Sequence, residues 1–301
     1  MSVVEEPQVR HLHDTLALDE RMMKNDELNK YVADKNEKYN MSPRLYGKLF
    51  EAVTDDFGRE VLKPVNANCV VAGGAIFTLM KLFGVTPSWM PQTLNQIYNI
   101  NADIESNPMN AQVALFSVGI GGCGMMFNSV IDADPKQRDV ADLIPIRVTS
   151  EETLTGTDAE KYFMKTKLAG TDMTAYMAKE FDQPVKIRSL WKDAAEEGED
   201  GTEITGEIYD STRTEGQEHF AEMILKFNKN DVRSYWEAIG DLSMARFNSI
   251  GIYFGEKVII DAATGAIDYV NVGLFSTINF ENDSVKDRKE IKYVYRLYAI
   301  I

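Results

Sequence analysis

The sequence predicts an α+β protein, with a helical N-terminal region followed by a C-terminal antiparallel β-sandwich-like domain. Apolar residues recur at helical spacing in 14–39 and 42–58, short strand-like runs separated by turn residues follow, and the chain ends on an alternating strand pattern. These three observations divide the chain into a charged arm or helix over 1–40, a mixed helical region with a glycine-rich loop over 41–140, and a β domain over 141–301.

The first predicted helix is strongly charged and has only an imperfect apolar stripe. Asp14 or Thr15 is its expected N-cap. The stripe consists of Leu16, Met22, Met23, Leu28, Tyr31 and Val32. Because these positions are too few for a core helix, we expect the segment to dock on a neighbouring surface, of its own subunit or of another, or to remain a solvated arm. Met22, Met23 and Tyr31 are therefore candidate assembly contacts.

Two further helices are predicted before the β domain. Ser42 caps the first, Pro43 occupies its first turn, and four apolar residues follow at helical spacing: Leu45, Leu49, Phe50 and Val53. The second covers residues 75–83 and ends at Gly84, after a tight turn at Gly73–Gly74. The glycine pair does not indicate a P-loop, because the Lys and Ser or Thr that must follow its last glycine are missing.

The segment Gly119–Gly124 raises the question of a cofactor. Gly119, Gly121 and Gly124 fit the spacing G-x-G-x-x-G after a predicted strand over 112–118, and Asp139 or Asp142 lies near the distance expected for a ribose-binding acid. Against this, the following segment is short for a crossover helix, and no alternating strand and helix repeats surround it. We expect a loop that permits close backbone approach and no cofactor, with a nucleotide-dependent enzyme as the alternative.

The β domain is predicted from strand patterns and one charged gap. Residues 193–203 are acidic and glycine-punctuated, which predicts an exposed loop. Residues 173–181 fit a short helix or a strand, and 230–239 fit a short helix capped by Asn230 and stopped by Gly240. Strands are expected over 142–148, 161–168, 183–191, 204–209, 220–227, 249–254, 257–260 and 267–275, the last two joined as a hairpin.

The closing segment, residues 290–301, is the most regular strand pattern in the chain. One face carries Ile291, Tyr293, Tyr295 and Leu297, and the other carries Lys292, Arg296 and Tyr298. Chain ends usually fray, and this one is patterned to be held in a sheet. We expect Tyr293, Tyr295 and Tyr298 to serve in packing and as candidate assembly contacts.

Composition excludes several classes of function. The formal net charge of -15, from 47 acidic and 32 basic residues, disfavours binding to nucleic acid. The two cysteines and three histidines form no recognisable metal motif, and no catalytic motif is present, so we expect neither a metal nor an enzyme. The apolar stretch 69–83 is interrupted by polar residues and glycines, which argues against a membrane span.

Part of the chain resembles a known class of proteins. The segments 232–238, 245–255, 269–280 and 291–298 are similar to virion structural proteins of large tailed bacteriophages that form rings in the neck or tail. This resemblance implies a non-enzymatic subunit of a homo-oligomeric ring, located in the virion, assembled in the host cytoplasm and in contact with portal, connector, sheath or tube proteins. A host-directed interaction protein is a further alternative.

Overall fold

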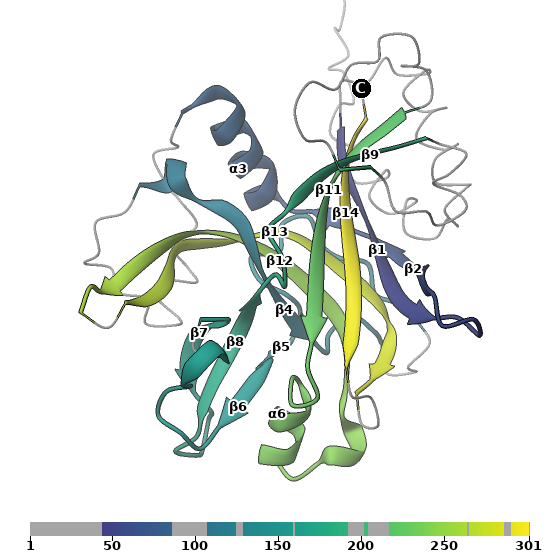
Figure 1. Ribbon diagram of the computed structural model, residues 1–301. Helices are drawn as coiled ribbons and strands as arrows, with labels where there is room; N and C mark the ends of the chain where they lie inside the picture. Colours follow the sequence, from purple (N-terminus) through teal and green to yellow (C-terminus); the bar gives the residue numbers. More distant parts are fainter. Residues whose placement is uncertain are drawn as a thin grey trace, which may run out of the picture.

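The protein consists mainly of two antiparallel β-sheets. The computed structural model describes residues 44–85, 107–124, 129–158, 160–191, 202–203, 217–263, 265–285 and 290–300, which contain fourteen strands and two α-helices (Figure 1). The α+β prediction is therefore wrong, because strands prevail in the described part of both predicted halves. The predicted helix over 14–39, with Met22, Met23 and Tyr31, lies outside the described residues.

The first sheet has six strands and includes both the first and the last strand described. Its members are, in spatial order, β10 (Thr202–Glu203), β9 (Lys186–Trp191), β11 (Gln217–Phe227), β14 (Ile291–Ile300), β1 (Arg44–Thr54) and β2 (Glu60–Ala67). The closing strand is held as predicted, since β14 lies between β11 and β1 rather than at an edge. Of the predicted acidic loop 193–203, the structure describes only Thr202–Glu203, which form β10 and pair with β9; the other residues of this loop lie outside the described ranges.

The second sheet has eight strands and is built around a long hairpin. Its main order is β3 (Cys69–Val70), β13 (Ala266–Ser284), β12 (Arg246–Asp261), β4 (Gln112–Gly119), β8 (Thr174–Glu180) and β6 (Arg147–Thr149). Two more strands are attached: β5 (Leu143–Ile144) pairs with β4, and β7 (Tyr162–Lys167) pairs with β8. The predicted hairpin is confirmed and longer than expected. Segments from both sides of residue 141 are hydrogen-bonded in each sheet, so the boundary predicted there does not separate the two sheets.

The predicted helix from Ser42 to Gly58 is wrong, because this segment forms strand β1 and the turn into β2. Leu45 and Leu49 pack against the core between the sheets, whereas Phe50 lies on the outer face beneath the Arg296 guanidinium. Both faces of β1 are thus apolar in part, which produces helix-like spacing in a strand. The segment forms a strand because it pairs with β14, which comes from a distant part of the sequence.

The main core lies between the two sheets. Tyr293 and Tyr295 of β14 share one cluster with aromatic and aliphatic side chains of the other sheet: Phe116, Val118, Phe247, Ile250, Ile252, Phe254, Phe275, Ile278 and Phe280. Gly47 makes room for this packing, since a Cβ there would lie 2.4 Å from the Tyr295 hydroxyl oxygen. The sandwich-like arrangement of antiparallel sheets expected for the C-terminal region is therefore present, and it also includes β1, β2 and β4.

Helix α3 (Ala72–Phe83) packs on the hairpin at the edge of this core. Phe77 stacks on Phe254 with ring centroids 4.3 Å apart, and the helix ends at Gly84 as predicted. The predicted turn at Gly73–Gly74 is wrong, because both glycines belong to the helix. A Cβ on Gly74 would lie 2.1 Å from the carbonyl oxygen of Phe275, so glycine allows the helix to touch the backbone of β13.

The second helix, α6 (Arg233–Ala238), confirms the short helix expected there. The predicted cap is wrong, since Val232 occupies the N-cap position, at φ 63°, and no side chain caps the helix. Residues 173–181, left open between helix and strand, form β8. Short 3-10 turns cover Pro108–Asn110, Gly156–Asp158 and Leu242–Met244. The strand predicted over 204–209 lies outside the described residues.

Candidate interaction surfaces

The Gly119–Gly124 loop is occupied by its own protein. The amides of Gly121, Gly122 and Gly124 donate to the Ala141 carbonyl, the Asn248 Oδ1 and the Ser129 carbonyl at 3.1, 2.6 and 2.9 Å. A phosphate cradle needs such amides to face the ligand. Close packing explains the glycines instead, because a Cβ on Gly119 would lie 2.3 Å from the carbonyl oxygen of Ala141.

Of the two expected ribose-binding acids, Asp139 has its carboxylate bonded within the protein. Asp139 accepts hydrogen bonds from the Tyr253 hydroxyl and from the amide of Val140, the latter at 2.8 Å. Asp142 contributes its backbone carbonyl to the amide of Ile120 at 3.0 Å, and the residue itself is exposed. The arrangement around the loop therefore gives no support to nucleotide binding.

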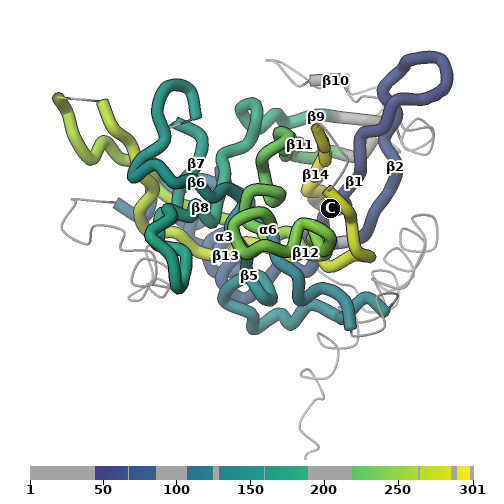
Figure 2. Tube along the Cα trace, turned by 90° about the horizontal axis from the view of Figure 1, so that it is seen from below, coloured from purple at the N-terminus to yellow at the C-terminus, as the bar shows by residue number. Residues whose placement is uncertain are grey.

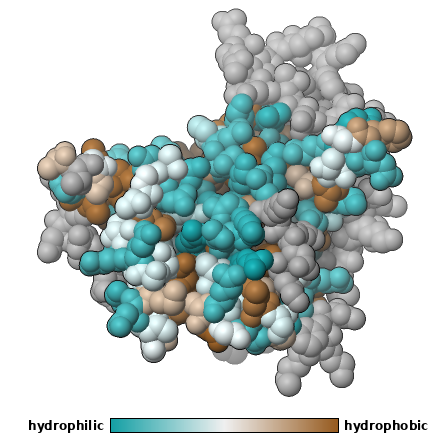
Figure 3. Space-filling model, turned by 60° about the horizontal axis from the view of Figure 1, so that its bottom comes forward, coloured by the Kyte–Doolittle hydropathy of each residue, from teal (hydrophilic) through white to brown (hydrophobic). Residues whose placement is uncertain are grey.

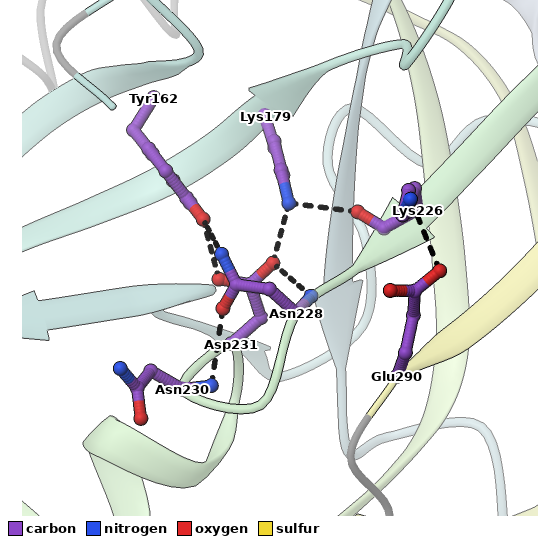
Figure 4. A network of polar contacts seen from close by, with 7 residues as sticks. All are labelled: Tyr162, Lys179, Lys226, Asn228, Asn230, Asp231 and Glu290. Atoms are coloured by element: carbon purple, nitrogen blue, oxygen red, sulfur yellow. Dashed lines mark hydrogen bonds and ion pairs between the residues drawn. The ribbon is translucent and has the colours of Figure 1, made fainter. Parts of the chain in front are cut away.

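A buried charge cluster is centred on Asp231 (Figure 4). Asp231 Oδ2 accepts from Lys179 Nζ at 2.6 Å and from the Asn228 amide at 3.0 Å, and Oδ1 accepts from the Tyr162 hydroxyl at 2.6 Å. The side chains of Asp231 and Lys179 are 0% and 8% exposed. Lys179 also donates to the carbonyl of Lys226 at 2.7 Å.

This cluster joins three segments, and its polar groups are already bonded to one another rather than available to a substrate. It connects β7, β8 and the turn between β11 and α6, and Figure 4 shows the side chains converging on the Asp231 carboxylate. Burial, and then the negative charge of Asp231, raise the pKa of Tyr162, so its hydroxyl stays a neutral donor. Because both carboxylate oxygens and the ammonium are already bonded within the protein, we interpret the cluster as a structural tie.

The outer face of the six-stranded sheet carries a further buried charge cluster. Glu222 accepts from Arg296 Nε at 3.0 Å and lies 2.9 Å from Arg188 Nε. The Arg296 guanidinium lies 4.7 Å from the ring centre of Phe220 and 5.4 Å from that of Phe50. Arg296 therefore lies on the outer face that its position in the sequence predicted, and its aromatic neighbours shield the ion pair from water.

The three tyrosines predicted as packing and assembly residues all lie inside the subunit. Tyr293 and Tyr295 are buried in the core between the sheets, and Tyr298 stacks on Tyr46 on the outer face with ring centroids 4.9 Å apart. The Tyr295 hydroxyl is bonded to Asn68, and burial raises its pKa. The surfaces open to another molecule therefore lie elsewhere.

Exposed apolar side chains occur on the projecting hairpin formed by the ends of β12 and β13, residues 256–270, which we call the arm. Ile259 and Ile260 are 66% and 43% exposed. The arm extends away from the body at the left of Figures 1 and 2, and hydrophobic residues are visible at that end in Figure 3. The hairpin was predicted, but its projection was not; the unbroken run Val258–Ile260, which lacks strand alternation, was the available signal.

A second exposed apolar surface lies on α3, on the face opposite the one that packs on β13. We call it the α3 stripe, and it consists of Leu79, Leu82, Phe83 and the following Val85. Leu82 and Phe83 are 72% and 68% exposed. The available sequence signal was an apolar residue on every side of the helix although only one side could face the core.

A third site of exposed apolar surface is Phe57, which is 83% exposed at the turn between β1 and β2. This turn projects on the side opposite the arm in Figures 1 and 2. Its contact is local, since the Arg59 guanidinium lies 5.3 Å from the ring centre. Phe57 is thus an isolated apolar residue, unlike the α3 stripe.

Comparison with protein-family models, curated proteins and solved structures finds no match to this chain. Within the described ranges, neither helix has the length and apolar character needed to cross a membrane. Over the same ranges, no three His, Cys, Asp or Glu side chains gather as metal ligands do.

Proposed function

We propose that the chain is a non-enzymatic structural subunit of a tailed-phage virion, which forms a symmetric ring in the neck, at the head-to-tail connection, or in the tail. The observation that carries this proposal is the location of the exposed apolar residues. Several of them gather on a projecting hairpin and on one helix face of a double-sheet body, whereas the Asp231 and Glu222 charge clusters are internal. Exposed apolar surface of this kind is typical of interaction sites.

The charge of the chain supports a role in a conduit for DNA. With a net charge of -15, the subunit repels a phosphate backbone, so DNA can pass through a ring of such subunits without being retained. The resemblance of segments 232–238, 245–255, 269–280 and 291–298 to phage ring proteins supports the same conclusion. Portal, connector, sheath or tube proteins are the proposed neighbours.

The experiment combines the oligomeric state of the chain with its location. Native mass spectrometry of the purified full-length protein, alone and with its gene neighbours, is expected to show a closed homo-oligomer. Mass spectrometry of purified particles is expected to detect the chain in a fixed ratio to a ring-forming neighbour. A strictly monomeric protein that is absent from particles would contradict the proposal, and recovery only with host proteins from infected cells would favour a host-directed interaction protein.

A further inference from the structure

We propose that the arm of one copy of this chain packs on the α3 stripe of the next copy, in a head-to-tail contact. This inference rests on the proposed ring function and adds the two surfaces that join neighbouring subunits. The partner is a second copy of the chain, and the contact is heterologous because the two surfaces differ. Repetition of a heterologous contact produces a ring when its rotation closes.

The arm has the structure of a docking element. Strand β4 pairs with β12 only as far as Gly255, and β3 pairs with β13 only at Ser276 and Thr277. The base of the arm packs on β7 and β8, where Tyr269 contacts Phe163 and Lys257 pairs with Glu180. In the described part of the chain, the outer end of the arm around Ile259 and Ile260 is a two-stranded ribbon. Such ribbons have little stability of their own in water, and packing on another surface stabilises them. Ile259 and Ile260 are the side chains that this packing would bury.

The α3 stripe has the chemistry to receive such an arm. Leu79, Leu82 and Phe83 are spaced as one helix face, and Val85 extends it. The helix contains no acidic residue, and Lys81 is its one charged side chain. The Lys81 ammonium uses one donor for the Met109 carbonyl, at 2.6 Å, and retains others for a partner.

Charge favours a second copy as the occupant. Like-charged subunits repel, so self-association requires surfaces with few carboxylates. Residues 61–102, which include α3, contain no Asp or Glu although the whole chain has 47. The turn of the arm carries the exposed Asp261, whose charge is opposite to that of Lys81. An acidic chain with one long acid-free segment has complementary parts for a neighbour of its own kind.

The tip of the arm does not pack on α3 of its own subunit. Figures 1 and 2 both show the tip of the arm extending away from the body, well apart from α3. The stripe of the same subunit therefore lies apart from the tip of its own arm, and a neighbouring copy can supply the arm that covers it.

The test uses two surface variants of the full-length chain and one matched control. Ile259→Asp changes the arm, Leu82→Asp changes the stripe, and Phe57→Ser removes an equally exposed apolar residue that the contact does not use. By native mass spectrometry at one protein concentration, each of the first two variants is expected to dissociate to monomers, with association weakened at least about tenfold, while Phe57→Ser keeps the wild-type oligomer.

A mixture of the two defective variants gives the sharpest readout. The arm variant retains an intact stripe and the stripe variant retains an intact arm, so an equimolar mixture is expected to form heterodimers and nothing larger. Absence of heterodimers would overturn the head-to-tail pairing. Wild-type oligomers that persist in both variants would overturn the inference alone, whereas a monomeric wild-type chain absent from particles would overturn the proposed function. A stripe variant that stays oligomeric but melts at a lower temperature would place the stripe in an intramolecular contact and would also refute the inference.

Discussion

The Asp231 cluster allows a quantitative prediction about stability. Replacing Asp231 with Ala leaves the Lys179 ammonium buried with only the Lys226 carbonyl as its described acceptor, and it removes the acceptor of the Tyr162 hydroxyl and the Asn228 amide. Breaking a buried ion pair by removal of one partner costs about 3–5 kcal/mol. Because the side chains are 0% and 8% exposed, solvent screening reduces this cost little. We expect Asp231→Ala to lower the free energy of unfolding by about 3–5 kcal/mol.

The assay is urea unfolding followed by circular dichroism, with all variants at one protein concentration because an oligomer unfolds in a concentration-dependent manner. The matched control is Lys292→Ala, which removes a 2.6 Å ion pair with Glu60 whose side chains are 28% and 54% exposed. Exposed pairs contribute at most about 1 kcal/mol, so the control is expected to lose no more than that.

A double variant separates the ion pair from the rest of the cluster. Lys179→Met with Asp231→Ala removes both charges, so it is expected to cost less than the sum of the single changes, by about 1–3 kcal/mol. The reasoning would be refuted if Asp231→Ala and Lys292→Ala destabilised equally, or if the two changes in the cluster were additive.

Three further predictions concern single groups. Gly47→Ala is expected to destabilise the protein by about 1–3 kcal/mol, because its Cβ would overlap the buried Tyr295 ring; an unchanged melting temperature would contradict the packing described. Burial raises the pKa of Asp268 above its ordinary 3.8, so its stabilising contribution is complete below that value and is lost as pH rises through the folded pKa. Asp268→Asn should therefore raise the melting temperature near neutral pH and have no such effect in acid. An equal change of melting temperature at neutral and acidic pH would argue against a raised pKa of Asp268 as the cause. Burial also raises the pKa of Tyr162 and of Tyr269 well above 10.0, and both contribute stability that is lost only as alkali ionises them. Spectrophotometric titration of tyrosine should thus show a group that ionises only when the protein unfolds, and complete ionisation of the folded protein near the ordinary pKa would exclude this burial.

Local patterns predicted the elements that carry a clear sequence signal of their own, including some whose partners lie far away in the sequence. The hairpin of β12 and β13, the strand β4, the helix α3 and the closing strand β14 all carry their own signals. The faces of β14 were also predicted, since Tyr293 faces the core and Arg296 faces outward.

The failures arose where contacts distant in sequence decide the structure. Phe50 completes a helix-like pattern in β1 only because Arg296 and Glu222 bury the outer face of the same sheet. Gly73 and Gly74 suggested a turn because a sequence does not show that a neighbouring backbone lies within 3.0 Å of their missing Cβ atoms. The same reason applies to the interaction surfaces. The apolar residues of the arm and of the α3 stripe are visible in the sequence. Their exposure depends on where the two sheets end, which the sequence does not show.

The central position of β14 determines when the six-stranded sheet can fold during synthesis of the chain. Strands β1 and β2 are made before β14, yet β1 pairs with β14 from Arg44 to Glu51, and β11 pairs with the other edge of β14. Until residues 291–300 have been synthesised, the early hairpin has no sheet to join and its apolar face stays open to water. The six-stranded sheet therefore cannot form in full before β14 has been made, and until then β1 keeps an unpaired edge.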